Sequence, residues 1–184
     1  LLPACSVMPP VADPLSIVPN DFSLDVTVVT TQPHTLAHMR SSRFVVFPDG
    51  SLHHGDKAGW GPNTLPPRTR TLSREQIAVI WNRLDQMGMT NASRADETVN
   101  FQLLPQLDFG SVYMIAVTAK GKYWNFVRYI GEDDPADPAF ESIIRLLAGY
   151  AWATDLPDVD VQQEPDRYDL GPDPYARYRG DATQ

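Results

Sequence analysis

The sequence has little of several features that mark common protein classes. It contains a single cysteine in 184 residues, so no disulfide can form within the chain and burial of apolar side chains must hold the fold. It has no run of about 18 or more apolar residues, so we expect no segment of it to cross a bilayer as a helix. Positive charge is scarce, because 15 Lys and Arg residues stand against 23 Asp and Glu residues. A net charge of −8 repels a phosphate backbone, and we therefore predict no nucleic-acid partner.

Local signatures of catalysis are missing as well. The sequence has no HExxH pair for zinc hydrolysis, no Gly-x-Ser-x-Gly nucleophile turn and no phosphate-binding loop that ends in Gly-Lys-Ser/Thr. A nucleophile assembled from positions distant in sequence leaves no such signature. Because these motifs are missing, we predict that the protein is not an enzyme.

Composition divides the chain into three zones. Residues 1–20 contain five prolines, which exclude a helix or a central strand, and we predict an extended leader. Residues 21–154 carry the periodic apolar pattern and predict one globular domain of ordinary size. Residues 155–184 contain eight acidic residues against three arginines and four prolines, and we predict an extended acidic tail with a net charge of −5.

Strand patterns occur in two groups within the globular domain. Apolar and β-branched residues alternate through each segment, and glycine-containing turns at Pro48-Asp49-Gly50 and Lys120-Gly121-Lys122 join neighbouring segments. The predicted strands are 24–31, 43–47, 51–54, 111–119 and 123–130. Residues 55–70 are rich in glycine and proline and show no apolar period, so we predict a long surface loop there.

Two amphipathic helices are predicted, one after each group of strands. The first starts at Ser73, which forms a capping box with Gln76, and it ends before Gly88. The second starts with Asp137 as the cap and Pro138 in the first turn. Both repeat apolar residues at helical spacing, namely Ile77, Ile80, Trp81 and Leu84 in the first and Phe140, Ile143, Ile144 and Leu147 in the second. The expected fold class is α+β, an antiparallel sheet of about four to five strands with both helices packed on one face.

The start of the chain resembles the lipobox of bacterial lipoproteins. In Leu2-Pro3-Ala4-Cys5, an apolar residue lies three places before the cysteine and a small residue directly precedes it. The resemblance covers four residues, and residues 21–154 look similar to uncharacterised domains of cell-envelope lipoproteins. The resemblance to a lipobox implies a lipid attached covalently to Cys5 and a membrane-anchored location in the bacterial periplasm or on the cell surface.

The four histidines lie close together in the sequence and are candidate metal ligands. His34, His38, His53 and His54 all fall within 21 residues, and imidazole nitrogen is a common ligand of zinc and copper. On a strand, His53 and His54 point to opposite faces, so only one of them can join a shared site. We therefore take His34, His38 and His54 as the candidate metal set. No acidic residue adjoins His34 or His38 to orient them, so the expected cofactor is none apart from the lipid on Cys5.

Aromatic side chains in the irregular segments are the candidate partner-binding residues, because Tyr and Trp are enriched at protein interfaces. They are Trp60, Tyr168, Tyr175 and Tyr178. Pro67, Arg68, Arg70 and Arg74 form a small basic group that could bind carboxylates.

These features favour a non-enzymatic accessory subunit of a larger membrane-associated or cell-envelope assembly. Its extended arms would bind neighbouring protein subunits, and its lipid would bind the membrane. Two alternatives stay open. One is a metal-binding protein or metalloenzyme that uses the histidines, and the other is a binder of small molecules or peptides that uses residues 55–70.

Overall fold

The computed structural model describes residues 18–31, 34, 36–55, 64–96, 110–131 and 134–153. The predicted acidic tail at 155–184 lies outside these ranges, as does the predicted leader at 1–20 apart from its last three residues. Of those three, Val18 packs against the hydrophobic core, and the Pro19 carbonyl accepts a 3.0 Å hydrogen bond from the Phe22 amide.

The described residues form one six-stranded antiparallel sheet with the strand order β4-β3-β2-β1-β5-β6. The strands are β1 (Ser23–Thr30), β2 (Ser42–Val46), β3 (Ser51–Gly55), β4 (Arg68–Thr71), β5 (Ser111–Ala119) and β6 (Lys122–Ile130). Strand β1 lies in the middle, where Leu24 pairs with Val46 of β2 on one side and with Val117 of β5 on the other. Strand β1 therefore joins the two groups of strands into one sheet.

The predicted α+β class is confirmed, and the sheet has one strand more than expected. That strand is β4, which includes residues 68–70 of the predicted 55–70 loop. Its sequence, Arg-Thr-Arg-Thr, has no apolar side chain and follows two prolines, so it shows no alternation of apolar and polar residues. Strand β4 is an edge strand with β3 as its one neighbour in the sheet, and such a strand needs little apolar character.

Both helices start at the predicted caps. Helix α1 (Arg74–Gln86) begins after Ser73, whose side chain accepts a hydrogen bond from the Gln76 amide in a complete capping box. Helix α2 (Pro138–Tyr150) begins after Asp137, whose carboxylate accepts from the Ala139 amide. Among the described residues, no helix is long and apolar enough to span a membrane.

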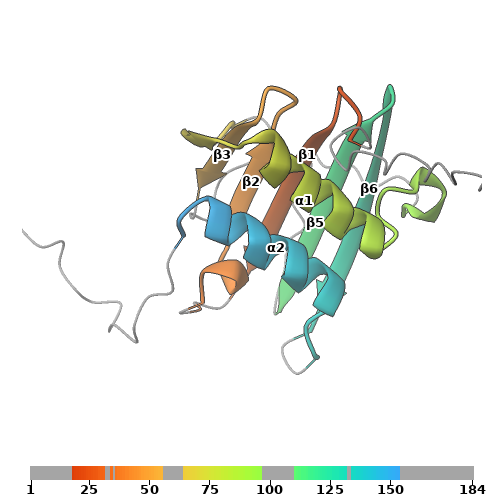
Figure 1. The fold of residues 1–184 in the computed structure, drawn as a ribbon. Coiled ribbons are helices and arrows are strands. Elements are labelled where there is room, and N and C mark those ends of the chain that lie inside the picture. The colour runs from red at the N-terminus through yellow and green to blue at the C-terminus, as the bar shows by residue number, and fades with distance from the viewer. Residues whose placement is uncertain are drawn as a thin grey trace, which may run out of the picture.

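The two helices lie side by side across one face of the sheet (Figure 1). The core between the layers contains the predicted helical residues Ile80, Trp81 and Leu84 of α1 and Phe140, Ile143, Ile144 and Leu147 of α2, all of them buried. On the sheet side they pack with side chains such as Val26, Phe44 and Ile115. Each large apolar side chain buried in this way contributes about 1.5–3 kcal/mol, which is what holds the helices to the sheet.

Two short 3-10 helices complete the described structure. Helix η2 (Ala37–Met39) lies between β1 and β2 and contacts α2, and η3 (Ala92–Arg94) follows α1 and contacts β6. Each therefore ties a connecting segment to an element that is distant in sequence.

Candidate functional site

Most of the sequence-predicted site residues lie outside the described residues. These are the lipidation candidate Cys5 and the candidate partner-binding residues Trp60, Tyr168, Tyr175 and Tyr178. The candidate metal ligands His34, His38 and His54 are described, and so is the basic group after residue 66.

The four histidines occupy separate environments. The His54 ring stacks on Phe44, with centroids 4.5 Å apart, on the helix-covered face of the sheet. The His53 ring lies edge-on to Phe47, and its Nδ1 donates to the Pro66 carbonyl at 2.8 Å. His53 and His54 therefore point to opposite faces of β3, as predicted. Within the described ranges, no three His, Cys, Asp or Glu side chains are grouped so that they could hold a metal ion, so His34, His38 and His54 do not meet there.

His38 forms a charged cluster with two residues of α2. Its side chain is 7% exposed, and its Nε2 lies 3.0 Å from Oε1 of Glu141. The same carboxylate oxygen accepts a 2.6 Å hydrogen bond from Nη2 of Arg145, one helical turn further along α2. Arg145 Nη2 also lies 3.3 Å from His38 Nε2. Because His38 Nε2 donates its proton to Glu141, both nitrogens are donors that converge on the same carboxylate oxygen.

The electrostatics of this cluster keep Glu141 ionised. The hydrogen bond from Arg145 lowers the pKa of Glu141 below its ordinary value, and the hydrogen bond from His38 lowers it further against the opposing effect of burial. A carboxylate that orients an imidazole is an arrangement also found in general bases. Within the described residues, however, the His38 side chain donates to Glu141 and lies beside Arg145, and no hydroxyl is among its polar contacts. The cluster therefore fastens η2 to α2.

A small cavity lies between the start of β5 and the residues that precede α2. It has a volume of about 90 Å³, and its polar lining includes His34, Ser111, Tyr113 and Asp134. Burial, together with the negative charge of Glu141, raises the pKa of the Tyr113 hydroxyl, so Tyr113 is neutral at physiological pH. Pockets for drug-sized ligands have volumes of about 300–1,000 Å³, and this cavity has room for a few water molecules.

A larger hollow of about 400 Å³ lies on the outer side of the helices, lined in part by Arg83, Glu141, Ser142 and Arg145. Its charged groups are already bonded within the protein. Arg83 donates to the Ser142 hydroxyl, and Arg145 donates to Glu141. Glu141 and Arg145 are therefore paired with each other, whereas Arg83 meets a neutral hydroxyl and forms no ion pair among the described residues.

The edge of the sheet at β4 carries positive charge and an exposed aromatic ring. Arg68 and Arg70 lie on β4, Arg74 is the first residue of α1, and Trp152 follows α2. The Trp152 side chain is 65% exposed, and the Arg70 guanidinium lies 4.7 Å from its ring centroid, a cation–π contact. We call Arg68, Arg70, Arg74 and Trp152 the β4 surface.

None of the three arginines of the β4 surface forms an ion pair within the described part of the chain. Arg70 donates a 3.4 Å hydrogen bond to the Tyr150 carbonyl at the end of α2, where a cation is favourable. Arg74 lies in the first turn of α1, where the helix dipole disfavours a cation. The positive charge of Arg74 therefore does not stabilise α1 through the helix dipole.

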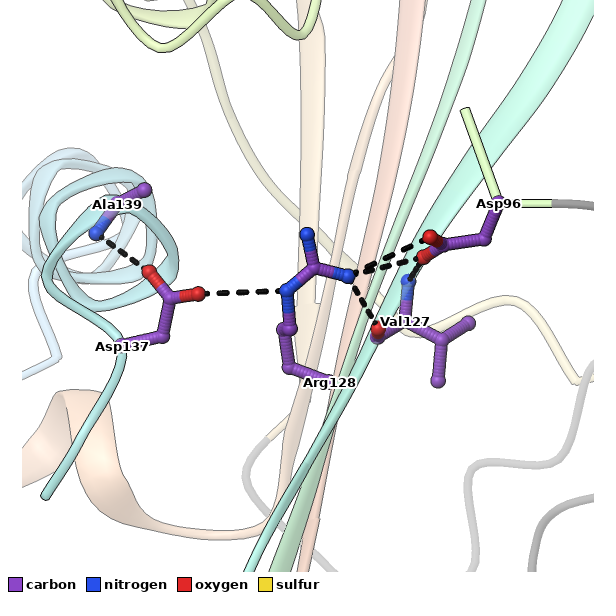
Figure 2. Close-up of polar contacts among 5 residues, drawn as sticks. All are labelled: Asp96, Val127, Arg128, Asp137 and Ala139. Atoms are coloured by element: carbon purple, nitrogen blue, oxygen red, sulfur yellow. Dashed lines mark hydrogen bonds and ion pairs between the residues drawn. The ribbon is translucent and has the colours of Figure 1, made fainter. Parts of the chain in front are cut away.

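The opposite edge of the sheet, at β6, is partly covered by Asp96 (Figure 2). The Asp96 amide donates to the Asn125 carbonyl at 3.0 Å, and its carboxylate accepts from the Val127 amide at 2.6 Å. Arg128 bridges this carboxylate to the α2 cap, with 3.1 Å to Asp96 Oδ2 and 3.4 Å to Asp137 Oδ2. We call these contacts the Asp96 clasp, and they occupy backbone groups in the middle of the β6 edge.

Sequence reasoning identified the arginines of the β4 surface but missed Trp152 and the Asp96 clasp. Trp152 directly follows an amphipathic helix and lies outside its apolar stripe, and this position could have indicated an exposed ring. No local pattern marks Asp96, because its partners are about thirty residues away. A scan against models of known protein families finds no match to this chain, and a search of curated proteins finds no similar protein.

Proposed function

We propose that this chain is a non-enzymatic accessory subunit of a larger membrane-associated or cell-envelope assembly. In this proposal, a lipid on Cys5 anchors it in the bacterial periplasm or on the cell surface. The α+β domain serves as a rigid body, and the segments at either end bind neighbouring protein subunits. Its partners are then proteins and the membrane, with no nucleic acid and no cofactor other than the lipid.

The β4 surface is the observation that carries this proposal. On a protein with a net charge of −8, three arginines and an exposed Trp lie at one edge of the sheet, with Arg70 against Trp152 and Arg68 on the opposite face beside Thr71. Arg and Trp are the residue types that most often dominate the binding energy of protein interfaces. The clusters at Glu141 and Asp96, by contrast, have their charges paired within the protein, which favours a structural role for them.

The lipid anchor is tested at the amino terminus of the mature protein. Mass spectrometry of the protein isolated from its native membrane should show that the mature chain begins at Cys5 and carries acyl groups. A Cys5→Ser variant should leave the membrane fraction, because loss of the thiol removes the point of attachment. A mature chain that retains Leu1 to Ala4, with an unmodified Cys5, contradicts the anchor.

The accessory role is tested by removing residues 155–184 in the native host and isolating the complex. We expect the shortened protein to keep the melting temperature of the full chain but to be lost from the assembly, because the tail contacts partners instead of the core. A large drop in melting temperature would place the tail in the fold. Unchanged assembly would contradict the proposed role of the tail.

The two alternatives have less support. A metal-binding function has no ligand group among the described residues, and metal analysis of the purified protein, with the His34→Ala/His38→Ala variant as control, tests it directly. Binding of small molecules or peptides by the 55–70 segment depends mainly on positions 56–63, which lie outside the described residues. A saturable ligand that contacts Trp60 would favour that alternative.

A further inference from the structure

A pocket of about 200 Å³ opens at the end of the sheet where α1 begins. The residues before β1, the β2–β3 turn and the first turn of α1 line it, and all three lie at the same end of the fold (Figure 1). Among the described residues that line it, Arg74 is the one that carries a charge, and five are apolar, namely Val18, Pro19, Phe22, Pro48 and Ile77. We propose that this pocket binds a small carboxylic acid, whose carboxylate meets Arg74 and whose short apolar tail packs against the apolar walls. This site goes beyond the proposed function and does not depend on it.

The wall of the pocket that precedes β1 is fixed by contacts to distant parts of the chain. Phe22 is 1% exposed, and its ring lies edge-on to Trp81 of α1 with centroids 5.0 Å apart. The Asp21 carboxylate accepts hydrogen bonds from the Lys120 amide at 2.8 Å and from the Gly121 amide at 2.6 Å. These contacts tie the residues before β1 to α1 and to the β5–β6 turn. A ligand therefore meets a preformed wall, and its binding loses little free energy to ordering of the protein.

The positive charge of Arg74 is not neutralised by an ion pair within the described part of the chain. Three acidic residues adjoin pocket residues in the sequence, but none of them lines the pocket, and they bond to the β5–β6 turn, to Ser51 and to Ser73 instead. They are Asp21, Asp49 and Glu75. Arg74 is exposed at the first position of α1, where the helix dipole disfavours a cation. A bound carboxylate would offset this unfavourable interaction.

The pocket has few hydrogen-bond donors, and this scarcity favours a carboxylate over a phosphate. Its two prolines have no amide proton. The Phe22 amide donates to the Pro19 carbonyl and the Ile77 amide donates to the Ser73 carbonyl, both at 3.0 Å. The guanidinium of Arg74 is the charged donor, and its planar fork matches a carboxylate with two parallel hydrogen bonds. A phosphate carries more charge and more oxygen atoms that need donors, so this lining suits it less well.

The volume and the apolar walls limit the length of the tail. Pockets for drug-sized ligands start at about 300 Å³, so a pocket of about 200 Å³ suits an acid with a short carbon chain. Each methylene group buried against Val18, Pro48 or Ile77 adds affinity in proportion to the apolar area that it removes from water. Hexanoate combines a carboxylate with such a chain, and it is therefore the probe of choice.

The experiment is an NMR titration of the isotope-labelled full chain with hexanoate. We expect saturable shifts of the Phe22 and Ile77 amides and no shift of the Val127 amide at the β6 edge. Hexanamide has the same tail and no charge, and it should bind about tenfold more weakly. Acetate should also bind about tenfold more weakly, because its single methyl group leaves the apolar walls in contact with water.

Variants show whether Arg74 recognises the acid. Arg74→Gln should weaken the binding of hexanoate about tenfold, because it removes the charged partner of the carboxylate. The same substitution should raise the melting temperature slightly, since it removes a cation from the start of α1, and a loss of binding would then not come from a damaged fold. The matched control is Arg68→Gln, an exposed arginine that does not line the pocket, and it should change the affinity less than twofold. Equal affinities of Arg74→Gln and the wild type would contradict the site.

Three further outcomes would overturn the proposal. One is equal affinity for hexanoate and hexanamide, and a second is tighter binding of inorganic phosphate than of hexanoate. The third is a set of nuclear Overhauser effects from the Ile77 methyl groups to residues 1–17 in the free protein, which would show that the chain itself fills the pocket. The proposed function is tested separately, because the Arg74→Gln variant keeps both Cys5 and residues 155–184.

Discussion

Individual charged residues in this protein act mainly as fasteners between segments that are far apart in the chain. Glu141 is the clearest example, because its Oε1 accepts from both His38 of η2 and Arg145 of α2. Arg43 is another, since it bonds the Asp25 carboxylate through two nitrogens, the shorter bond being 2.6 Å, and also donates to the Thr64 carbonyl. In both cases a single side chain bonds polar groups that take no part in the backbone hydrogen bonds of the helices and strands.

The Glu141 cluster predicts how stability depends on pH. Hydrogen bonds from Arg145 and His38 lower the pKa of Glu141 in the folded state below its ordinary value. A lowered pKa stabilises the fold above the unfolded-state pKa, and this contribution is lost as the pH falls through the folded-state pKa. We therefore expect Glu141→Gln to destabilise the protein at pH 7. The expected loss is about 1 kcal/mol, because the Glu141 side chain is partly exposed and solvent screens its charge.

The measurement is the free energy of unfolding in urea at neutral and acidic pH. The difference between wild type and Glu141→Gln should shrink toward zero as the pH falls through the lowered folded-state pKa of Glu141, because the wild-type carboxyl is then protonated too. Other acidic residues titrate in both proteins and cancel in the difference. A difference that stays constant from pH 7 to pH 3 would show that the ionisation of Glu141 contributes nothing.

At the scale of elements, turns and caps set the boundaries of the strands and helices. The β5–β6 hairpin turns through Lys120 and Gly121, both with positive φ, as a two-residue turn between twisted strands requires. The β2–β3 turn uses Gly50 at φ +83°, where the chain packs closely against the residue that follows β4. The two glycines therefore differ in their surroundings although both need a positive φ.

This difference predicts unequal costs for the same substitution. A Cβ at Gly50 would lie 2.7 Å from the Leu72 carbonyl oxygen, whereas a Cβ at Gly121 would meet nothing within 4 Å. We expect Gly121→Ala to cost about 1 kcal/mol for the positive φ alone. Gly50→Ala should cost about 2–3 kcal/mol, because the backbone must also shift. Equal losses of stability in thermal unfolding would contradict the close approach at Gly50.

The Asp96 clasp predicts a protected edge at β6. Asp96→Ala removes the acceptor of the Val127 amide and one partner of Arg128, and we expect a loss of about 1–2 kcal/mol. Hydrogen exchange at Val127 should then speed up more than at Ile115 in the interior of the sheet. The matched control is Asp134→Ala, which removes an exposed carboxylate bonded to the Gly131 amide and should leave exchange at Val127 unchanged.

At the scale of the whole molecule, α2 joins most parts of the fold. It packs on the sheet, contacts α1 and η2, and receives Arg128 at its amino end and Arg70 at its carboxyl end. The buried residues of α2 belong to the same apolar cluster as those of α1 and of the sheet. Loss of packing at α2 should therefore destabilise the whole domain together.

We expect Leu147→Ala, at a fully buried position, to lower the free energy of unfolding by about 2–5 kcal/mol. Val79→Ala on α1 is the matched control, since this side chain is 44% exposed and its truncation should change stability by no more than about 0.5 kcal/mol. Far-UV circular dichroism and tryptophan fluorescence should report one coincident transition in both variants. Separate transitions would mean that α2 unfolds apart from the sheet.

Features with short-range causes were predictable from the sequence. The capping box at Ser73, the cap at Asp137 and the tight turn at Lys120 and Gly121 depend on residues a few positions apart, and the structure has them as predicted. Strand β4 was missed because its edge position removes the need for apolar side chains. The histidines were grouped by proximity in sequence, but strand alternation and the packing of η2 direct them to different surroundings.

By itself the sequence determined the number and character of most elements, since apolar periodicity and capping chemistry act within a few residues of each other. It also determined the acidic net charge and the position of the arginines near β4. The tertiary structure alone decided that β1 lies between β2 and β5, that His38 meets Glu141 across 103 residues, and that Trp152 lies against Arg70. These pairings depend on which surfaces bury the most apolar area when the whole chain folds, and local spacing carries no information about that choice.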